Sequence, residues 1–308
     1  MLFFLCFFQR DFKEGIINYH VPVLINKILN FVPLDIDKEE NLIIDACFGE
    51  GGYTDIFLEK FKNLFIVGIE QDTQIYNIVK EKYKDEKRLI LFNSNFINID
   101  QILKVDYLKD KKPRFIVFDL GISMFHIKES DKGISFSKDS RLDMRINKDA
   151  KESAYDIINN YSKEELADLF YYLADETMSR QIANEIVNYR KKKKIETNEE
   201  LVKIVANVKK GSRKNPATKV FQALRIKVNN ELENLKIVLE KLLNIVEKDC
   251  VISIVSYHSG EDRIVKNFIK NNISFLNPLV KKPILPDYEE IKANPSARSA
   301  KLRVFSKK

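Results

Sequence analysis

Short apolar runs alternate with helical patterns between residues 42 and 118, and this alternation constrains the fold more than any other feature. The helical patterns are Tyr53–Lys62 and Gln74–Tyr83. The apolar runs have the length and composition of buried strands, and they are Leu42–Ile44, Leu64–Ile69, Leu89–Phe92 and Phe115–Phe118. Strands that alternate with helices are typical of a parallel sheet with helices on both faces. We therefore expect an α/β fold with a doubly wound sheet.

The alternation stops near residue 153, and from there to residue 210 every pattern is helical. Ser162 and Glu165 form a capping-box pattern at the start of one of these helices. The helices expected in this region are Lys163–Tyr172, Glu176–Lys192 and Asn198–Val208. We expect an inserted all-helical domain over residues 136–215, which interrupts the sheet domain.

After the insertion the chain returns to the sheet. A longer helical run over Thr218–Val246 leads to strand-like segments at Val251–Tyr257 and Lys301–Phe305. We therefore assign residues 20–135 and 216–308 to the sheet domain and residues 1–19 to an N-terminal extension. Two domains agree with a prior of about 150 residues per domain.

We do not expect the first eight residues, MLFFLCFF, to be a targeting or anchoring segment. A secretory signal has a positive start and a small-residue cleavage site, and a membrane helix needs about 20 apolar residues. Cys6, Cys47 and Cys250 lie far apart, which argues against a disulfide scaffold and a cysteine zinc site. We expect a cytoplasmic protein without a metal site.

The positive charge of the chain is concentrated in one stretch. The net charge is +7, and residues 190–219 hold eleven Lys or Arg and three Glu, a local charge of +8. Arg190–Lys194 and Lys209–Lys214 supply most of it. Such a stretch is typical of a surface that binds nucleic-acid phosphates, and it also occurs as solvated charge at helix ends. The charge therefore favours a nucleic-acid partner and leaves a plain solvated surface open.

The loop after the first strand, Asp45–Tyr53, contains three glycines. A glycine-rich turn between a strand and a helix lets a ligand approach the backbone closely. The third glycine of the dinucleotide pattern G-x-G-x-x-G would fall at Thr54, so that pattern fails. Glu70 follows Gly49 by 21 residues at the end of the second strand, where an acid suits ribose hydroxyls. The combination favours S-adenosylmethionine, with a tight turn that binds nothing as the alternative.

Several longer strings, in order along the chain, carry a family resemblance. They are HVPVL (20–24), the glycine loop, DLGIS (119–123), GISF (133–136), LDMR (142–145), NPATKVFQALRI (215–226), VNNEL (228–232), SYHSGEDR (256–263) and NPSARSAKLR (294–303). With these strings the chain resembles the RsmH (MraW) family, S-adenosylmethionine-dependent methyltransferases that act on the N4 amine of a cytidine in small-subunit (16S) ribosomal RNA. The resemblance implies a class I (Rossmann-like) methyltransferase sheet with an inserted all-helical domain, in agreement with the change of pattern near residue 153.

The resemblance also implies which residues contact S-adenosylmethionine. These are Gly51, Gly52, Tyr53, Glu70, Phe96, Asp119 and His126. Three of them depart from the usual family residues, since Tyr53 stands in place of His, Glu70 in place of Asp, and His126 in place of Gln. The implied partner is small-subunit ribosomal RNA or the assembled small subunit, and the sequence leaves a monomer and a homodimer open.

We assign catalysis to Asp119, at the end of the fourth strand. The lone pair of the cytosine N4 is delocalised into the ring, so a site must hold the amine with acceptors and align it with the methyl carbon. A carboxylate at this strand end could accept those hydrogen bonds, and a loop-capping Asp is the structural alternative. Methylation at cytosine C5 would need a cysteine nucleophile, and neither Cys47 nor Cys250 is placed for that role.

Six more residues are candidates for binding the RNA substrate, each with an ordinary structural alternative such as an ion pair or a local hydrogen bond. They are Asp143, Arg145, Arg225, His258, Arg263 and Arg298. Two other functions stay open, an S-adenosylmethionine-dependent methyltransferase of another substrate and a ribosome-assembly factor that binds RNA without catalysis. The chemical identity of any methylated product distinguishes them.

Overall fold

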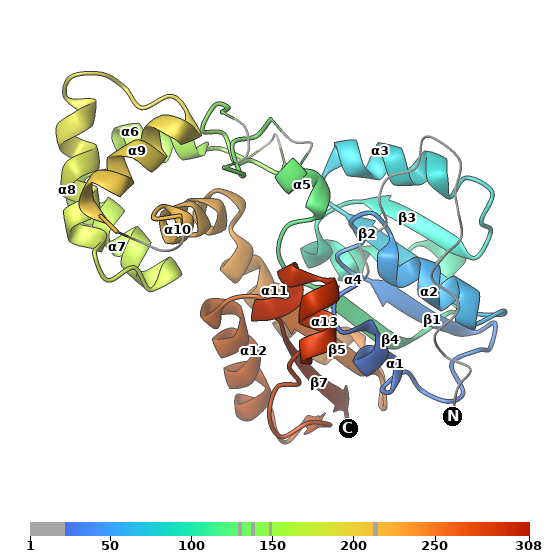
Figure 1. Ribbon diagram of the computed structural model, residues 1–308. Coiled ribbons are helices and arrows are strands. Elements are labelled where there is room, and N and C mark those ends of the chain that lie inside the picture. The colour runs from blue at the N-terminus through green and yellow to red at the C-terminus, as the bar shows by residue number, and fades with distance from the viewer. Residues whose placement is uncertain (1–21, 129–130, 137–138, 148–149, 212–214) are drawn as a thin grey trace.

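The computed structural model describes residues 22–128, 131–136, 139–147, 150–211 and 215–308. The expected extension 1–19 and the start of the string at 20–24 therefore lie outside the described residues. The chain forms a seven-stranded sheet with helices on both faces and a group of helices beside it (Figure 1). The predicted α/β fold class is confirmed.

All the predicted strands are present, within a few residues of their expected bounds. The sheet consists of β1 (Asn41–Asp45), β2 (Phe65–Glu70), β3 (Leu89–Asn93), β4 (Lys112–Asp119), β5 (Val251–Ser256), β6 (Leu276–Pro278) and β7 (Lys301–Lys307). Their order is β3-β2-β1-β4-β5-β7-β6, and the first five pair in parallel. This is the order expected of a class I methyltransferase sheet, with the topological reversal between β1 and β4.

One edge of the sheet is antiparallel. β7 runs antiparallel to both β5 and β6, with Lys301 opposite Ser256. Strand β7 is antiparallel because the chain enters it beside the carboxyl end of β5 and runs back along that strand. Strand β6 was not predicted, since its three residues include one buried side chain and no alternating pattern.

Alternating side chains on the strands divide the core of the sheet domain between two faces. Ile43 and Val117 face one set of helices, whereas Ile44 and Ile116 face another. The first face is covered by α1 (Ile25–Leu29), α2 (Gly52–Lys60) and η3 (Pro295–Ser299), the second by α4 (Ile99–Ile102), α11 (Glu231–Ile245) and α12 (Ser259–Asn271). The other elements of this part are α3 (Thr73–Lys82), η1 (Phe96–Asn98), η2 (Asp106–Leu108), α5 (Met124–Lys128) and α13 (Tyr288–Ala293).

The helical group has a core of its own. It consists of α6 (Ala154–Asn160), α7 (Lys163–Ala174), α8 (Ser179–Arg190), α9 (Asn198–Val208) and α10 (Thr218–Asn229), drawn green to orange in Figure 1. The predicted capping box of Ser162 and Glu165 begins α7. The hydrophobic cluster of this group includes residues of α10 such as Leu224, which lie beyond the expected boundary at residue 215. The domain division 136–215 stays a prediction.

The helical run expected over Thr218–Val246 is divided in two. Asn230 has a φ of 51°, in the left-handed region, and it ends α10 and precedes α11. Asn tolerates this conformation better than most residues do. The turn directs the chain from the helical group back onto the sheet. Of the helices that the structure describes, none combines the length and apolar character that a membrane span requires.

Candidate active site

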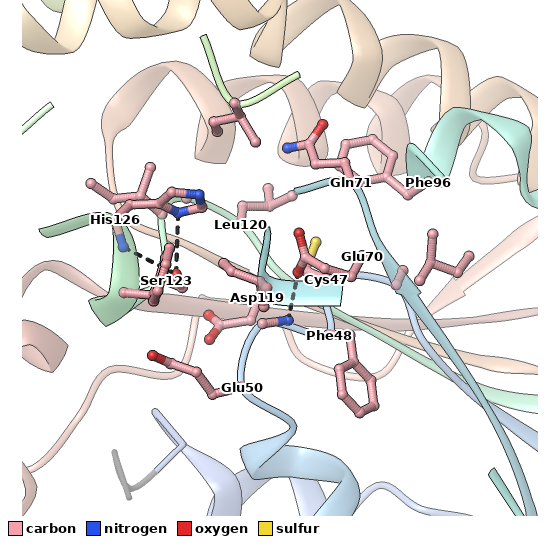
Figure 2. Close-up of a pocket in the computed structure, with 18 of the residues that line it drawn as sticks. Cys47, Phe48, Glu50, Glu70, Gln71, Phe96, Asp119, Leu120, Ser123 and His126 are labelled. Atoms are coloured by element: carbon pink, nitrogen blue, oxygen red, sulfur yellow. Dashed lines mark hydrogen bonds between the residues drawn. The ribbon is translucent and has the colours of Figure 1, made fainter. Parts of the chain in front are cut away.

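A cavity of about 550 Å³ lies at the carboxyl ends of the parallel strands. The segments that follow β1, β2, β3 and β4 form one side of it, and the junction of α10 and α11 forms another. Ile69, Ile78, Phe96 and Leu120 give it apolar walls, and Figure 2 labels Phe96 and Leu120. Its position beside the reversal of strand order is where open α/β sheets bind ligands. The volume is in the range of small-molecule sites.

The glycine loop is held against the cavity by the Glu70 carboxylate. Glu70 Oε2 accepts a hydrogen bond from Gly49 N at 2.9 Å (Figure 2), and Oε1 accepts one from Asp72 N at 2.6 Å. Gly51 has a φ of 86°, and a Cβ there would lie 2.2 Å from the Tyr83 hydroxyl oxygen. Burial raises the pKa of Glu70 to about 7. Each oxygen keeps lone-pair capacity for a further donor from the cavity.

Asp119 is the acid at the end of β4, and its carboxylate lines the same cavity. Its Oδ1 accepts a hydrogen bond of 2.6 Å from the Tyr257 hydroxyl. Burial raises the pKa of Asp119 to about 7, although the Tyr257 bond acts to lower it. Burial, with Asp119 nearby, raises the pKa of the Cys47 thiol well above its usual range. Cys47 is therefore no ready thiolate nucleophile, although it lines the same cavity.

His126 lines the cavity from α5, and both its ring nitrogens already have protein partners. Ser123 Oγ lies 3.1 Å from Nδ1, and Asp72 Oδ2 lies 2.9 Å from Nε2 (Figure 2 shows the Ser123 contact). Asp72 also accepts from the Lys132 ammonium. Burial would raise the pKa of Asp72, but the bonds from His126 and Lys132 lower it. His126 therefore ties α5 to the start of α3, and a cofactor contact at its side chain stays a prediction.

Most residues predicted to contact the cofactor line one cavity. They are Gly52, Tyr53, Glu70, Phe96, Asp119 and His126, whereas Gly51 shapes the loop without lining the cavity. The Tyr53 hydroxyl is not directed to a ligand, since it donates to Val23 O at 2.5 Å. Convergence of segments from four strand ends on one space supports the assignment of these residues to one site.

The predicted substrate residues are dispersed. Arg225 lines the cavity, but Asp143, Arg145, His258, Arg263 and Arg298 do not. Asp143 and Arg145 form a bidentate ion pair with distances of 2.7 and 2.9 Å, which is the structural alternative weighed from the sequence. Arg263 lies 3.8 Å from Asp175, and Arg298 is exposed. Their contacts with RNA stay predictions.

A polar network connects α10, α11 and α12 beside the cavity. Arg225 donates to both carboxylate oxygens of Glu231, at 2.8 and 2.9 Å. His258 Nδ1 accepts from Glu261 N at 3.4 Å and caps α12, and its Nε2 lies 3.2 Å from Glu261 Oε1. Sequence reasoning gave Glu231 and Glu261 no role, although both lie in the quoted strings.

The same network contains a group that could hold a metal ion. Among the described residues, Glu231, His258 and Glu261 place their ligand atoms within 4.8 Å of one another. The Glu231 carboxylate is already engaged by Arg225, however. With Nδ1 as an acceptor, a neutral His258 ring carries its hydrogen on Nε2 and offers no lone pair there. The arrangement fits a network that joins three helices better than a metal centre.

The basic stretch at the end of α8 is only partly free to bind phosphates. Arg190 donates to the carbonyls of Ile158 and Tyr161, which gives it a structural role. Lys193 pairs with Glu200 at 2.6 Å. The side chains of Lys191 and Lys192 are exposed. In the second run Lys209 pairs with buried Glu176 at 2.8 Å, and residues 212–214 lie outside the described part.

Comparisons with known proteins agree over nearly the whole chain. Residues 18–308 match the model of a family described as the MraW methylase family. A ribosomal RNA small subunit methyltransferase H of Hydrogenobaculum sp. is 44% identical over 286 residues, which cover 92% of this chain and 94% of the relative. Proteins of the same name from Borreliella burgdorferi and Persephonella marina are 45% and 40% identical, covering 94% and 92% of this chain and 98% of each relative.

Proposed function

The chain belongs to the MraW methylase family, and we propose that it transfers a methyl group from S-adenosylmethionine to the N4 amine of a cytidine in small-subunit ribosomal RNA. The names of its relatives support a small-subunit ribosomal RNA as the substrate. The observation that carries the proposal is that Glu70 and Asp119, from two strand ends, line one cavity with the glycine loop between them.

The residues of the cavity fit S-adenosylmethionine, which supplies an electrophilic methyl group when it is bound. The Glu70 carboxylate can accept from the ribose hydroxyls, since each oxygen uses only part of its acceptor capacity on backbone N–H groups. Ile69, Ile78 and Phe96 provide apolar surface for an adenine ring. Glu70 thereby keeps the carboxylate that the family resemblance implies at this position.

Asp119 supplies what a weakly nucleophilic amine needs. Its Oδ1 is occupied by Tyr257, and Oδ2 is the oxygen that can accept an N4 hydrogen. As the nitrogen–methyl bond forms and the methyl–sulfur bond breaks, the nitrogen becomes positive and must release a proton. A carboxylate with a pKa of about 7 accepts that proton at neutral pH and interacts most strongly when the nitrogen is cationic.

The helical group provides a surface for the RNA backbone. Lys191 and Lys192 are exposed at the end of α8, and phosphate contacts of this kind contribute affinity rather than sequence choice. A cytosine must be exposed or flipped out of a helix for its N4 to reach Asp119. Of the predicted substrate residues, Arg225 is the one placed to contact a cytosine in the cavity, since it lines the cavity. With ribosomal RNA as substrate, the protein acts in the cytoplasm.

Product analysis tests the proposal. Small subunits from a strain that lacks the protein are incubated with the purified protein and isotopically labelled S-adenosylmethionine, and the nucleosides are analysed by mass spectrometry. Label in N4-methylcytidine is the expected result, and subunits from the parent strain, already modified, serve as the control with little uptake. A different labelled nucleoside would indicate another methyltransferase activity. Binding of the subunits without transfer would indicate an assembly factor.

A further inference from the structure

Contacts of both its main chain and its ring hold Tyr257 beside Asp119. It follows β5, which pairs with β4 so that Asp119 lies opposite Val255. The Tyr257 backbone N donates to Glu261 Oε2 at 2.8 Å, which ties it to α12. Its ring lies against Gly121, where a Cβ would come 3.5 Å from ring carbon Cδ2. The main-chain contacts and the packing of the ring place the hydroxyl beside Asp119, to which it donates.

We propose that Tyr257 is a positioning residue for methyl transfer, whose hydroxyl fixes one oxygen of the Asp119 carboxylate and leaves the other oxygen for the substrate amine. The inference rests on the proposed function, because it assumes that Asp119 acts on the amine. The 2.6 Å bond from Tyr257 Oη to Asp119 Oδ1 restricts rotation of the carboxylate. Both residues line the cavity, so the remaining oxygen is available from it.

The charges around Asp119 explain why this hydroxyl matters. Asp45 and Glu261 place negative charge near Asp119 and raise its pKa, in addition to the effect of burial. The Cys47 thiol and the Tyr53 hydroxyl lie close enough to feel the charge of Asp119, and both stay neutral because burial raises their pKa values well above the usual range. Neither can compensate a negative charge on Asp119.

Tyr257 is the contact that stabilises the ionised form of Asp119, since its hydrogen bond lowers the pKa of that carboxyl. The Tyr257 hydroxyl stays protonated at neutral pH, because burial and Asp119 raise its own pKa well above the usual range. Loss of the hydroxyl should therefore move the ionisation of Asp119 to higher pH. A role in packing alone would not do so.

The test is the pH profile of single-turnover methylation by the parent and by Tyr257→Phe, with saturating cofactor and small subunits. We expect the acidic limb of the variant to move up by about one pH unit, the scale of one charged hydrogen bond. The rate relative to the parent should then be about tenfold lower at pH 6.5 than at pH 9.5, where Asp119 is ionised in both proteins and only the loss of its orientation remains. Tyr161→Phe is the matched control, because it removes a 3.0 Å tyrosine–carboxylate bond to Glu152 in the helical group. Its profile should match that of the parent.

A rate lowered equally at every pH, or an unmoved limb, would overturn the proposal for Tyr257. If the proposed function is wrong, the parent enzyme itself forms no N4-methylcytidine at any pH. If only the proposal for Tyr257 is wrong, the parent enzyme still forms this product. If Tyr257→Phe does not fold, 3-fluorotyrosine at position 257 replaces it, because its more acidic hydroxyl donates more strongly. The limb should then move to lower pH, and an unchanged limb would again contradict the proposal.

Discussion

Replacing Glu70 with Gln tests how the strand-end carboxylate binds the cofactor. The carboxylate accepts from Gly49 N at 2.9 Å and from Asp72 N at 2.6 Å, and the residue is 6% exposed. Gln keeps the size and one acceptor oxygen, but its NH2 group meets one of the N–H donors. Loss of a hydrogen bond to a charged group costs about 1–3 kcal/mol. We therefore expect cofactor affinity to fall about 5- to 150-fold.

The assay is calorimetry with S-adenosylhomocysteine and with an analogue that lacks both ribose hydroxyls. The parent should bind the analogue more weakly than S-adenosylhomocysteine, and this difference should be clearly smaller for Glu70→Gln, because its amide lacks the charge that strengthens the bonds from the hydroxyls. Glu86→Gln is the matched control, since Glu86 also accepts from a backbone N–H, that of Arg88, and does not line the cavity. If Glu70→Gln is as sensitive to the missing hydroxyls as the parent, Glu70 is not their partner.

The same residue gives a pH dependence with a definite sign. Burial raises the pKa of Glu70 from 4.5 to about 7, so its carboxylate ionises, and accepts better, as pH rises through 7. Cofactor affinity of the parent should increase over this range. The folded protein holds a proton that the unfolded chain releases above 4.5, so the contribution of Glu70 to the free energy of unfolding decreases between pH 4.5 and 7. In Glu70→Gln, neither cofactor affinity nor the free energy of unfolding should show the pH dependence that Glu70 causes.

Two further substitutions test the loop and the RNA surface. Gly51→Ala should lower the melting temperature and the cofactor affinity, because Gly51 has a φ of 86° and an added Cβ would clash with Tyr83. Gly211→Ala is the control, since Gly211 also has a positive φ, of 75°, but an added Cβ would meet no atom of the described residues within 4 Å. Equal losses in melting temperature would contradict the predicted clash. Lys192→Gln should reduce the salt dependence of RNA binding by about one unit of slope, whereas exposed Lys109→Gln should not. An unchanged slope would make Lys192 a solvated charge.

The parts of the fold that depend on local pattern could be predicted from the sequence. Apolar runs of strand length identified β1 to β5, and the serine and glutamate of a capping box identified the start of α7. The break at Asn230 was missed because Asn is compatible with both a helix and a left-handed turn. The antiparallel course of β7 depends on how distant segments return to the sheet, which a period-2 pattern does not encode.

The site also has features that the sequence predicts and features that only the folded structure shows. Glu70 and Asp119 could be identified because they end strands, and the carboxyl ends of parallel strands share one edge. The bond between Tyr257 and Asp119 joins residues 138 apart, and nothing in the spacing of the string around Tyr257 gives the direction of its hydroxyl. The partners of Arg225 and His126 also became visible only in three dimensions.

Single-turnover methylation by Asp119→Asn measures whether Asp119 is catalytic. Asn keeps the shape and one acceptor oxygen for Tyr257 or the amine, but it removes the charge that stabilises a cationic nitrogen. With small subunits and saturating S-adenosylmethionine, we expect the rate to fall at least about tenfold while RNA affinity stays near the parent value. A rate that returns fully to the parent value at saturating cofactor would show that Asp119 only binds the cofactor, and would contradict the claim.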